Sequence, residues 1–232
     1  IKFEKNLSKK IEILTAIILT GLVFHEYEEN FDIGIKELET LVKNFFDKDG
    51  FPLSRNPIDL VFFSKYLIFC KEVIKDSQKY VPEFLEEIIK KILDCIHFIK
   101  TPNKQLPLFN GANILSTNQI EKYLDNVKPD NKNNILGGLF KIKYKSHFLL
   151  IDIDKPPQKK FSKSYQSGPS SFEYFLDGTK IITNSGFGNY ISKKAEMLSR
   201  LTACQSTLTI NDTSITKFER NEMINKVFGN LN

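Results

Sequence analysis

The chain has few of the side chains that common enzyme sites rely on. Its 232 residues include no tryptophan, three histidines and three cysteines. Cys70, Cys95 and Cys204 lack the spacing of metal ligands. Because Cys70 and Cys95 fall in apolar helical stretches, we expect buried thiols and no disulfide framework. We expect His97 to be a packed, hydrogen-bonded residue on an apolar helix face.

Several functional signals are also missing. The sequence contains no glycine-rich phosphate loop, no Gly-x-Ser-x-Gly elbow and no His-Glu-x-x-His pair. The apolar stretch 13–24 is far shorter than the roughly 18 residues of a membrane span, so none is predicted. The net charge of +5 is spread along the chain and no reader motif accompanies it, so we do not predict nucleic-acid binding.

The apolar spacing of the first half predicts antiparallel helical hairpins. Helical periodicity covers residues 8–29, 33–47, 57–76 and 81–100, with Ser8 as the expected cap of the first helix. Pro57 and Pro82 stand near two helix starts, where proline is favoured. We therefore expect a helical domain over residues 1–135.

The second half predicts strands. A polar, turn-rich segment at 126–137 precedes short stretches at 139–144, 147–154, 170–176, 180–186 and 206–212, with a hairpin turn at 177–180. Helices followed by strands favour an α+β architecture with an antiparallel sheet domain over residues 136–232. So few strands leave edges open. We expect a homo-oligomer or the remainder of the same protein to complete the sheet, and the start at Ile1 suggests a trimmed piece.

Three polar stretches are candidates for ligand contacts. In "DKDGFPLSRNP" (47–57), Arg55 and Asn56 could bind a carboxylate, although the stretch also fits a plain helix–helix connection. In "LPLFNGAN" (106–113), Asn110 could turn its amide toward a ligand beside Gly111, although Asn-Gly is also a common turn. In "SYQSGPSSFEYFLDG" (164–178), Tyr165 and Gln166 lie where a loop enters a strand, although such residues are more often plain surface positions.

Taken in order, these stretches resemble the heparinase II/III-like family, in a branch of uncharacterised bacterial proteins. "FDKDGFPLSRNP" looks like its "DGG-x-x-SRNP" link, and "LPLFNGA" looks like its "L-x-x-FNG". "LLIDIDKPP" is similar to "D-x-G-x-PP". "SGPSSFEYFLDGTKIITNSG" resembles "AGxLSFExSxGxxxxVNCG", and "SRLTACQSTLTINDTS" resembles "RxTAAHSTLxLxDTSS". The match runs from about residue 10 to 218 and keeps order and spacing.

The resemblance implies a partial α/α toroid followed by a partial antiparallel β-sandwich. It also implies a polysaccharide lyase that acts by β-elimination on a uronate-containing acidic glycan. In that reaction the uronate carboxylate is neutralised, a base removes the C5 proton, and an acid protonates the departing O4 oxygen. Histidine and tyrosine usually share the proton transfers, and some relatives hold zinc nearby. The partner expected from this resemblance is an acidic polysaccharide, and the compartment, periplasmic or cytoplasmic, is left open.

This chain departs from the family at two histidines. The histidine of "TAAHST" falls on Gln205, and the histidine of "H-A-x-x-x-SF" falls on Gln166. An amide can hydrogen-bond but cannot titrate near neutral pH, and it is a poor zinc ligand, so no cofactor is expected. Tyr165 is the remaining candidate base, with Arg200 as the nearby positive charge that could lower its pKa.

Two functions therefore stay open from the sequence. One is a lyase in which Tyr165, Gln166 and Gln205 form the catalytic side. Arg55, Asn56, Asn110 and Arg200 would then bind the substrate across an interdomain cleft. The other is a catalytically inactive glycan-binding or scaffolding protein on the lyase fold.

Overall fold

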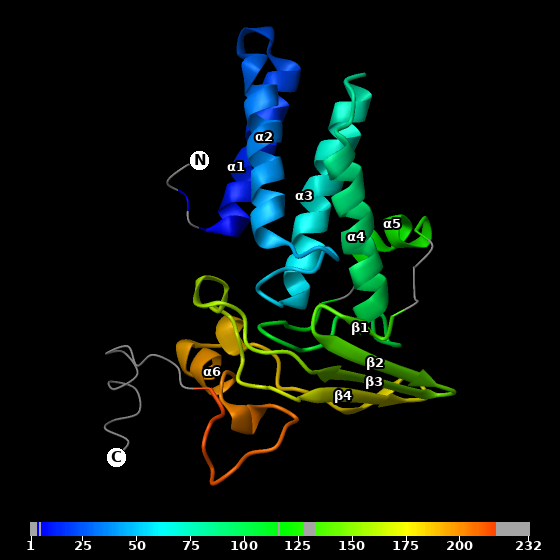
Figure 1. The fold of residues 1–232 in the computed structure, drawn as a ribbon, viewed down its shortest axis with the longest axis vertical. Helices are drawn as coiled ribbons and strands as arrows, with labels where there is room; N and C mark the ends of the chain where they lie inside the picture. Colours follow the sequence, from blue (N-terminus) through cyan, green and yellow to red (C-terminus); the bar gives the residue numbers. More distant parts are fainter. Residues whose placement is uncertain (1–3, 5, 116, 128–132, 217–232) are drawn as a thin grey trace.

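The computed structural model describes residues 4, 6–115, 117–127 and 133–216. Two antiparallel helix pairs stand side by side above a small β-sheet (Figure 1). The four long helices are α1 (Leu7–Val23), α2 (Glu29–Phe45), α3 (Pro57–Asp76) and α4 (Glu83–Ile99). Shorter helices follow at α5 (Glu121–Asp125), before the sheet, and α6 (Lys193–Leu198), after it. The predicted order of helices and then strands is confirmed.

Local capping chemistry fixes the helix starts. The Oδ1 atom of Asn6 accepts the backbone N–H of Ser8, so Asn6 caps α1 and the prediction of Ser8 as the cap is wrong. Pro57 occupies the first turn of α3 as predicted. Helix α1 also ends earlier than the expected residue 29, because Phe24 adopts an extended backbone (φ −111°) before a short 3₁₀ turn, His25–Tyr27.

The sheet has five antiparallel strands in the order β1-β2-β3-β4-β5. They are β1 (Ile135–Leu136), β2 (Leu139–Tyr144), β3 (His147–Asp152), β4 (Phe172–Leu176) and β5 (Thr179–Ile182). The β4–β5 turn falls at the predicted place, with Asp177 (φ 48°) and Gly178 (φ 77°) in the left-handed region. Each strand neighbours the next one in sequence, so the sheet is a simple meander.

The predicted strand at 206–212 is wrong. Within the described chain this segment has no neighbouring strand, and its only backbone pairing is an isolated bridge between Ile210 and Thr213. Leu208 and Ile210 are largely exposed. Ser206 fixes the start of the segment, because its hydroxyl contacts Phe172 and accepts from the Phe172 N–H at 3.0 Å. The alternating pattern is real, but alternation forms a strand only where a sheet edge or face receives it.

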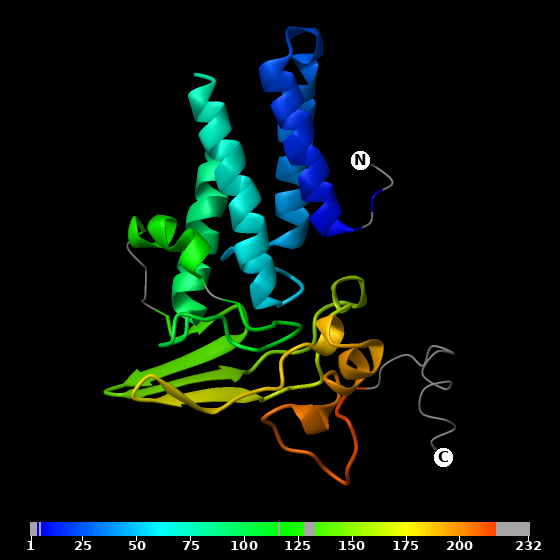
Figure 2. The same cartoon turned by 180° about the vertical axis from the view of Figure 1, so that it is seen from behind.

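One continuous apolar core joins the helices to one face of the sheet. Phe45 of α2, Leu150 of β3 and Phe175 of β4 belong to this cluster. Figure 2, from the opposite side, shows the sheet beneath the lower ends of the helices. Cys70 and Cys95 are buried in the core, as predicted.

Two further features complete the fold. His97 is hydrogen-bonded as expected, with its Nε2 2.7 Å from the Leu124 carbonyl. The face of the sheet turned away from the helices carries exposed apolar side chains, namely Ile142, Tyr144 and Ile182.

None of the helices in the described part of the chain is both long and apolar enough to span a bilayer.

Candidate functional site

Arg55 lies at the junction of the helices and the sheet and is buried there. Its backbone is left-handed (φ 58°) in the link before α3. Nη2 donates to Asp152 Oδ1 at 2.6 Å and to the Gly138 carbonyl at 3.2 Å. Nη1 donates to the carbonyls of Lys155 at 3.0 Å and Asp154 at 3.3 Å. A Cβ on Gly138 would meet Arg55 Nη2 at 2.6 Å, so the close approach depends on this glycine.

Asp152 is the carboxylate that Arg55 and Asn110 share. Asn110 Nδ2 donates to Asp152 Oδ2 at 3.2 Å, while Arg55 takes Oδ1. Burial raises the pKa of Asp152, and the charge and hydrogen bond of Arg55 oppose that rise. Arg55, predicted to bind a carboxylate of the ligand, and Asn110, predicted to turn its amide toward a ligand, therefore both donate to an internal carboxylate.

Asp152 was missed by the sequence reasoning, although a signal for it exists. Along β3, Phe148, Leu150 and Asp152 occupy alternate positions and all three are buried. Period two thus places a carboxylate on the same face as two core side chains, where it needs a cationic or hydrogen-bonding partner. That need points to a buried arginine such as Arg55.

Asn56 and Tyr165 lie at the same junction. Asn56 caps α3, with its Oδ1 accepting the Ile58 N–H at 3.0 Å and its Nδ2 3.5 Å from Ser164 Oγ. Tyr165 is only 2% exposed, and its hydroxyl makes no hydrogen bond of good geometry within the described residues. Burial and the nearby charge of Asp152 raise the pKa of Tyr165 to about 12, against the opposing charge of Arg55. This direction is the reverse of what a base at neutral pH requires.

Gln166 is buried, with 1% exposure, and its side chain hydrogen-bonds to the backbone of three other segments. Its Oε1 accepts the Gly111 N–H at 2.9 Å. Its Nε2 donates to the carbonyls of Gly186 at 2.9 Å and Ser199 at 2.8 Å. The close contact with the 106–113 loop depends on Gly111 (φ 103°), where a Cβ would lie 2.5 Å from that of Ser164. All three hydrogen bonds of this amide are internal.

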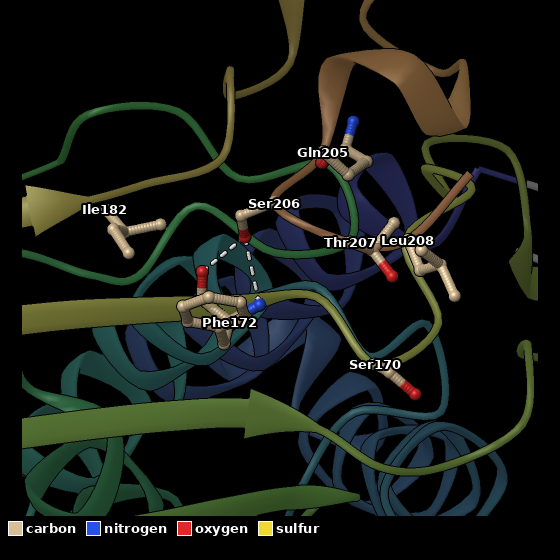
Figure 3. Close-up of a pocket in the computed structure, with 7 residues that line it drawn as sticks. All are labelled: Ser170, Phe172, Ile182, Gln205, Ser206, Thr207 and Leu208. Carbon is tan, nitrogen blue, oxygen red and sulfur yellow. Dashed lines mark hydrogen bonds between the residues drawn. The ribbon is translucent and has the colours of Figure 1, made fainter.

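Gln205 converges on the same carbonyl. Its Nε2 donates to the Ser199 oxygen at 2.7 Å, so the two amides lie side by side although 39 positions separate them in the chain. Gln205 also lines an open cavity of about 360 Å³ on the far side of β4 (Figure 3). Phe172, Ile182 and Leu208 supply its apolar wall, with Ser170, Ser206 and Thr207 between them.

The residues at this place do not fit a zinc ion. Both Nε2 groups point their N–H donors at one carbonyl oxygen, whereas a cation requires lone pairs. Nor do the described residues contain a group of three or more His, Cys, Asp or Glu side chains placed to hold a metal. The two amides instead connect their segments to the Ser199 backbone by hydrogen bonds.

Arg200 also hydrogen-bonds to the backbone, in the segment 162–165. Its Nε donates to the Tyr165 carbonyl at 3.0 Å and its Nη2 donates to the Ser162 carbonyl at 3.3 Å. The predicted residues thus fall into two connected groups: Arg55, Asn56, Asn110 and Tyr165 at the helix–sheet junction, and Gln166, Arg200 and Gln205 around Ser199. The two groups are in direct contact, since Arg200 Nε donates to the Tyr165 carbonyl, and a ligand cleft between them stays a prediction.

Comparisons with known proteins agree with this architecture. Residues 129–228 match the family described as "Heparinase II/III-like, C-terminal", which confirms the predicted family resemblance over that part of the chain. No curated protein matches.

Solved structures extend the likeness to the whole fold. A crystal structure of heparinase III covers 93% of this chain with 15% identity and a TM-score of 0.75. Heparan sulfate lyase HepC from Pedobacter heparinus covers 90%, with 20% identity and a TM-score of 0.66. The chain spans 40% and 37% of those two structures, respectively. Helical hairpins followed by an antiparallel sheet are therefore the partial form of a heparinase-type fold.

Proposed function

We propose that this chain binds an acidic polysaccharide on a lyase-type scaffold and does not perform β-elimination. The heparinase-like fold supports the ligand class, since the similar solved structures are titled heparinase III and heparan sulfate lyase. The proposed loss of β-elimination depends on one observation: Gln166 and Gln205 both donate to the Ser199 carbonyl.

That observation bears on proton transfer. Abstraction of the C5 proton needs a base whose pKa lies near the working pH. The family resemblance places histidines at residues 166 and 205, whereas a glutamine amide does not titrate. Gln166 Nε2 uses both of its N–H groups on the Gly186 and Ser199 carbonyls, and Gln205 Nε2 uses one N–H group on the Ser199 carbonyl. An amide N–H can hydrogen-bond to a departing sugar oxygen but cannot protonate it.

A lyase that uses Tyr165 as its base is the second candidate. It is favoured by the buried hydroxyl of Tyr165, which lacks a well-formed hydrogen bond and lies within the electrostatic reach of Arg55. The pKa of about 12 weighs against it, because almost none of the phenol would be ionised at neutral pH.

The test separates binding from cleavage. Heparan sulfate, hyaluronan and alginate are titrated into the protein by calorimetry, and each mixture is followed for the ultraviolet absorbance of unsaturated uronate, with heparinase III as the positive control. We expect binding to at least one glycan and no absorbance change. An absorbance increase that Tyr165→Phe abolishes would establish the second candidate instead. Failure of every glycan to bind would overturn the proposal.

A further inference from the structure

The loop between β3 and β4 concentrates positive charge. Residues 155–163 contain four lysines and no acidic residue: Lys155, Lys159, Lys160 and Lys163. All four side chains are exposed. The ammonium group of Lys160 lies 4.6 Å from the centre of the Phe161 ring. A compact run of exposed ammonium groups favours a ligand that carries repeated negative charge.

Both ends of this loop are held by arginines. Arg55 donates to the carbonyls of Asp154 and Lys155 at the start, and Arg200 donates to those of Ser162 and Tyr165 at the end. These arginines had been expected to meet the ligand. Their contacts instead fix the backbone from which the lysines project, which lowers the entropy lost when a ligand binds.

Packing holds the middle of the loop. The Phe161 ring lies 5.9 Å from that of Phe45, so the loop rests against the end of α2. Pro156 and Pro157 restrict the backbone beside it. Figures 1 and 2 both show this loop between the lower ends of α1 and α2 and the α6 region.

We propose that the loop 155–163 is the surface that binds an acidic polysaccharide. This inference rests on the proposed function and assigns its contact site. Lysine ammonium groups interact as hydrated point charges, so recognition would follow the charge density of the glycan more than its sugar geometry. Binding would weaken as salt rises, because ions screen exposed charges.

The test uses two variants of equal charge. The loop variant carries Lys155→Gln, Lys160→Gln and Lys163→Gln. The control variant carries Lys75→Gln, Lys90→Gln and Lys122→Gln, three exposed lysines on α3, α4 and α5. Affinity for heparin is measured at several salt concentrations, with thermal midpoints to verify folding. We expect the loop variant to lose at least about tenfold in affinity and the control to lose less than about twofold.

Four results would overturn the inference. Equal losses in both variants would indicate a nonspecific charge effect, and an unchanged loop variant that still binds heparin would place the site elsewhere while leaving the proposed function intact. If wild-type protein binds no acidic glycan, the proposed function fails together with this site. A parallel titration with single-stranded DNA covers the competing polyanion, and tighter loop-dependent binding of DNA than of heparin would assign the surface to nucleic acid.

Discussion

Gln166 and Gln205 stand where the family resemblance implies histidines, and the proposed loss of proton transfer depends on this change of side-chain type. Each amide spans a distance similar to that of an imidazole and retains hydrogen-bonding capacity, yet neither takes up or releases a proton near neutral pH. Both Nε2 groups donate to the Ser199 carbonyl, and Gln166 Nε2 also donates to the Gly186 carbonyl, so both N–H groups of Gln166 are satisfied inside the protein.

Restoring imidazoles tests whether these two positions converge. The double variant Gln166→His and Gln205→His replaces two N–H donors with ring nitrogens that offer lone pairs. We expect zinc affinity, measured by calorimetry, to rise at least about tenfold over wild type. The control is Gln105→His with Gln158→His, at two positions away from Ser199. No gain over this control would mean that the two side chains do not meet in solution.

Asp59 gives a separate prediction at the residue scale. Burial raises the pKa of Asp59 to about 6, while the hydroxyl of Ser54 donates to its carboxylate and opposes that rise. The folded state then binds more protons than the unfolded state between about pH 4 and pH 6. The contribution of Asp59 to stability is therefore fully present below pH 4 and is lost as pH rises through about 6.

The expected outcome of Asp59→Asn follows from that sign. The variant keeps an acceptor for Ser54 and removes the buried charge. At pH 7 we expect its free energy of unfolding in urea to exceed that of wild type by about 1–3 kcal/mol, with the advantage vanishing near pH 4. Equal stability of the two proteins at both pH values would contradict the raised pKa.

Among the elements, a buried ion pair joins the link before α3 to the end of β3. Arg55 and Asp152 form a buried pair there, whereas Lys43 and Glu39 form a pair of equal length, 2.6 Å, on the exposed side of α2. Equal distances do not imply equal energies. Burial leaves the remaining charge uncompensated when one partner is removed, whereas water solvates it at the surface.

The two pairs can be compared directly. We expect Arg55→Met or Asp152→Asn to lower the free energy of unfolding by about 3–5 kcal/mol, with the double variant losing much less than the sum. Lys43→Met should cost less than about 1 kcal/mol. Additive losses in the Arg55 and Asp152 cycle, measured by urea denaturation, would mean that the two elements are joined by other contacts.

Element positions followed from the sequence wherever local chemistry decided them. Helix periodicity, Pro57 at the start of α3 and the Asp177-Gly178 turn each depend on a few adjacent residues. The 206–212 segment did not follow, since a strand also needs a partner and that partner is a property of the tertiary structure. Local sequence did not predict the ion pair of Arg55 either, because its acceptor, Asp152, lies 97 residues away in the chain.

For the whole molecule, the helices and the sheet share one core, and the predicted site residues lie along their junction. Internal hydrogen bonds engage Arg55, Asn110 and Gln166, three residues that the sequence predicts to face a ligand. Exposed lysines on the 155–163 loop then remain as the surface suited to an acidic polymer. Under the proposed function, the heparinase-type scaffold binds an acidic glycan and does not cleave it.

The most direct test of this claim is the length of a bound glycan after prolonged contact with the protein. Heparan sulfate is held with excess wild-type protein at neutral pH, recovered in high salt and sized by gel filtration. We predict that heparan sulfate is bound by the protein until high salt releases it. The released chains should then have the same size distribution as untreated polymer. A shift to shorter, unsaturated chains would contradict the account.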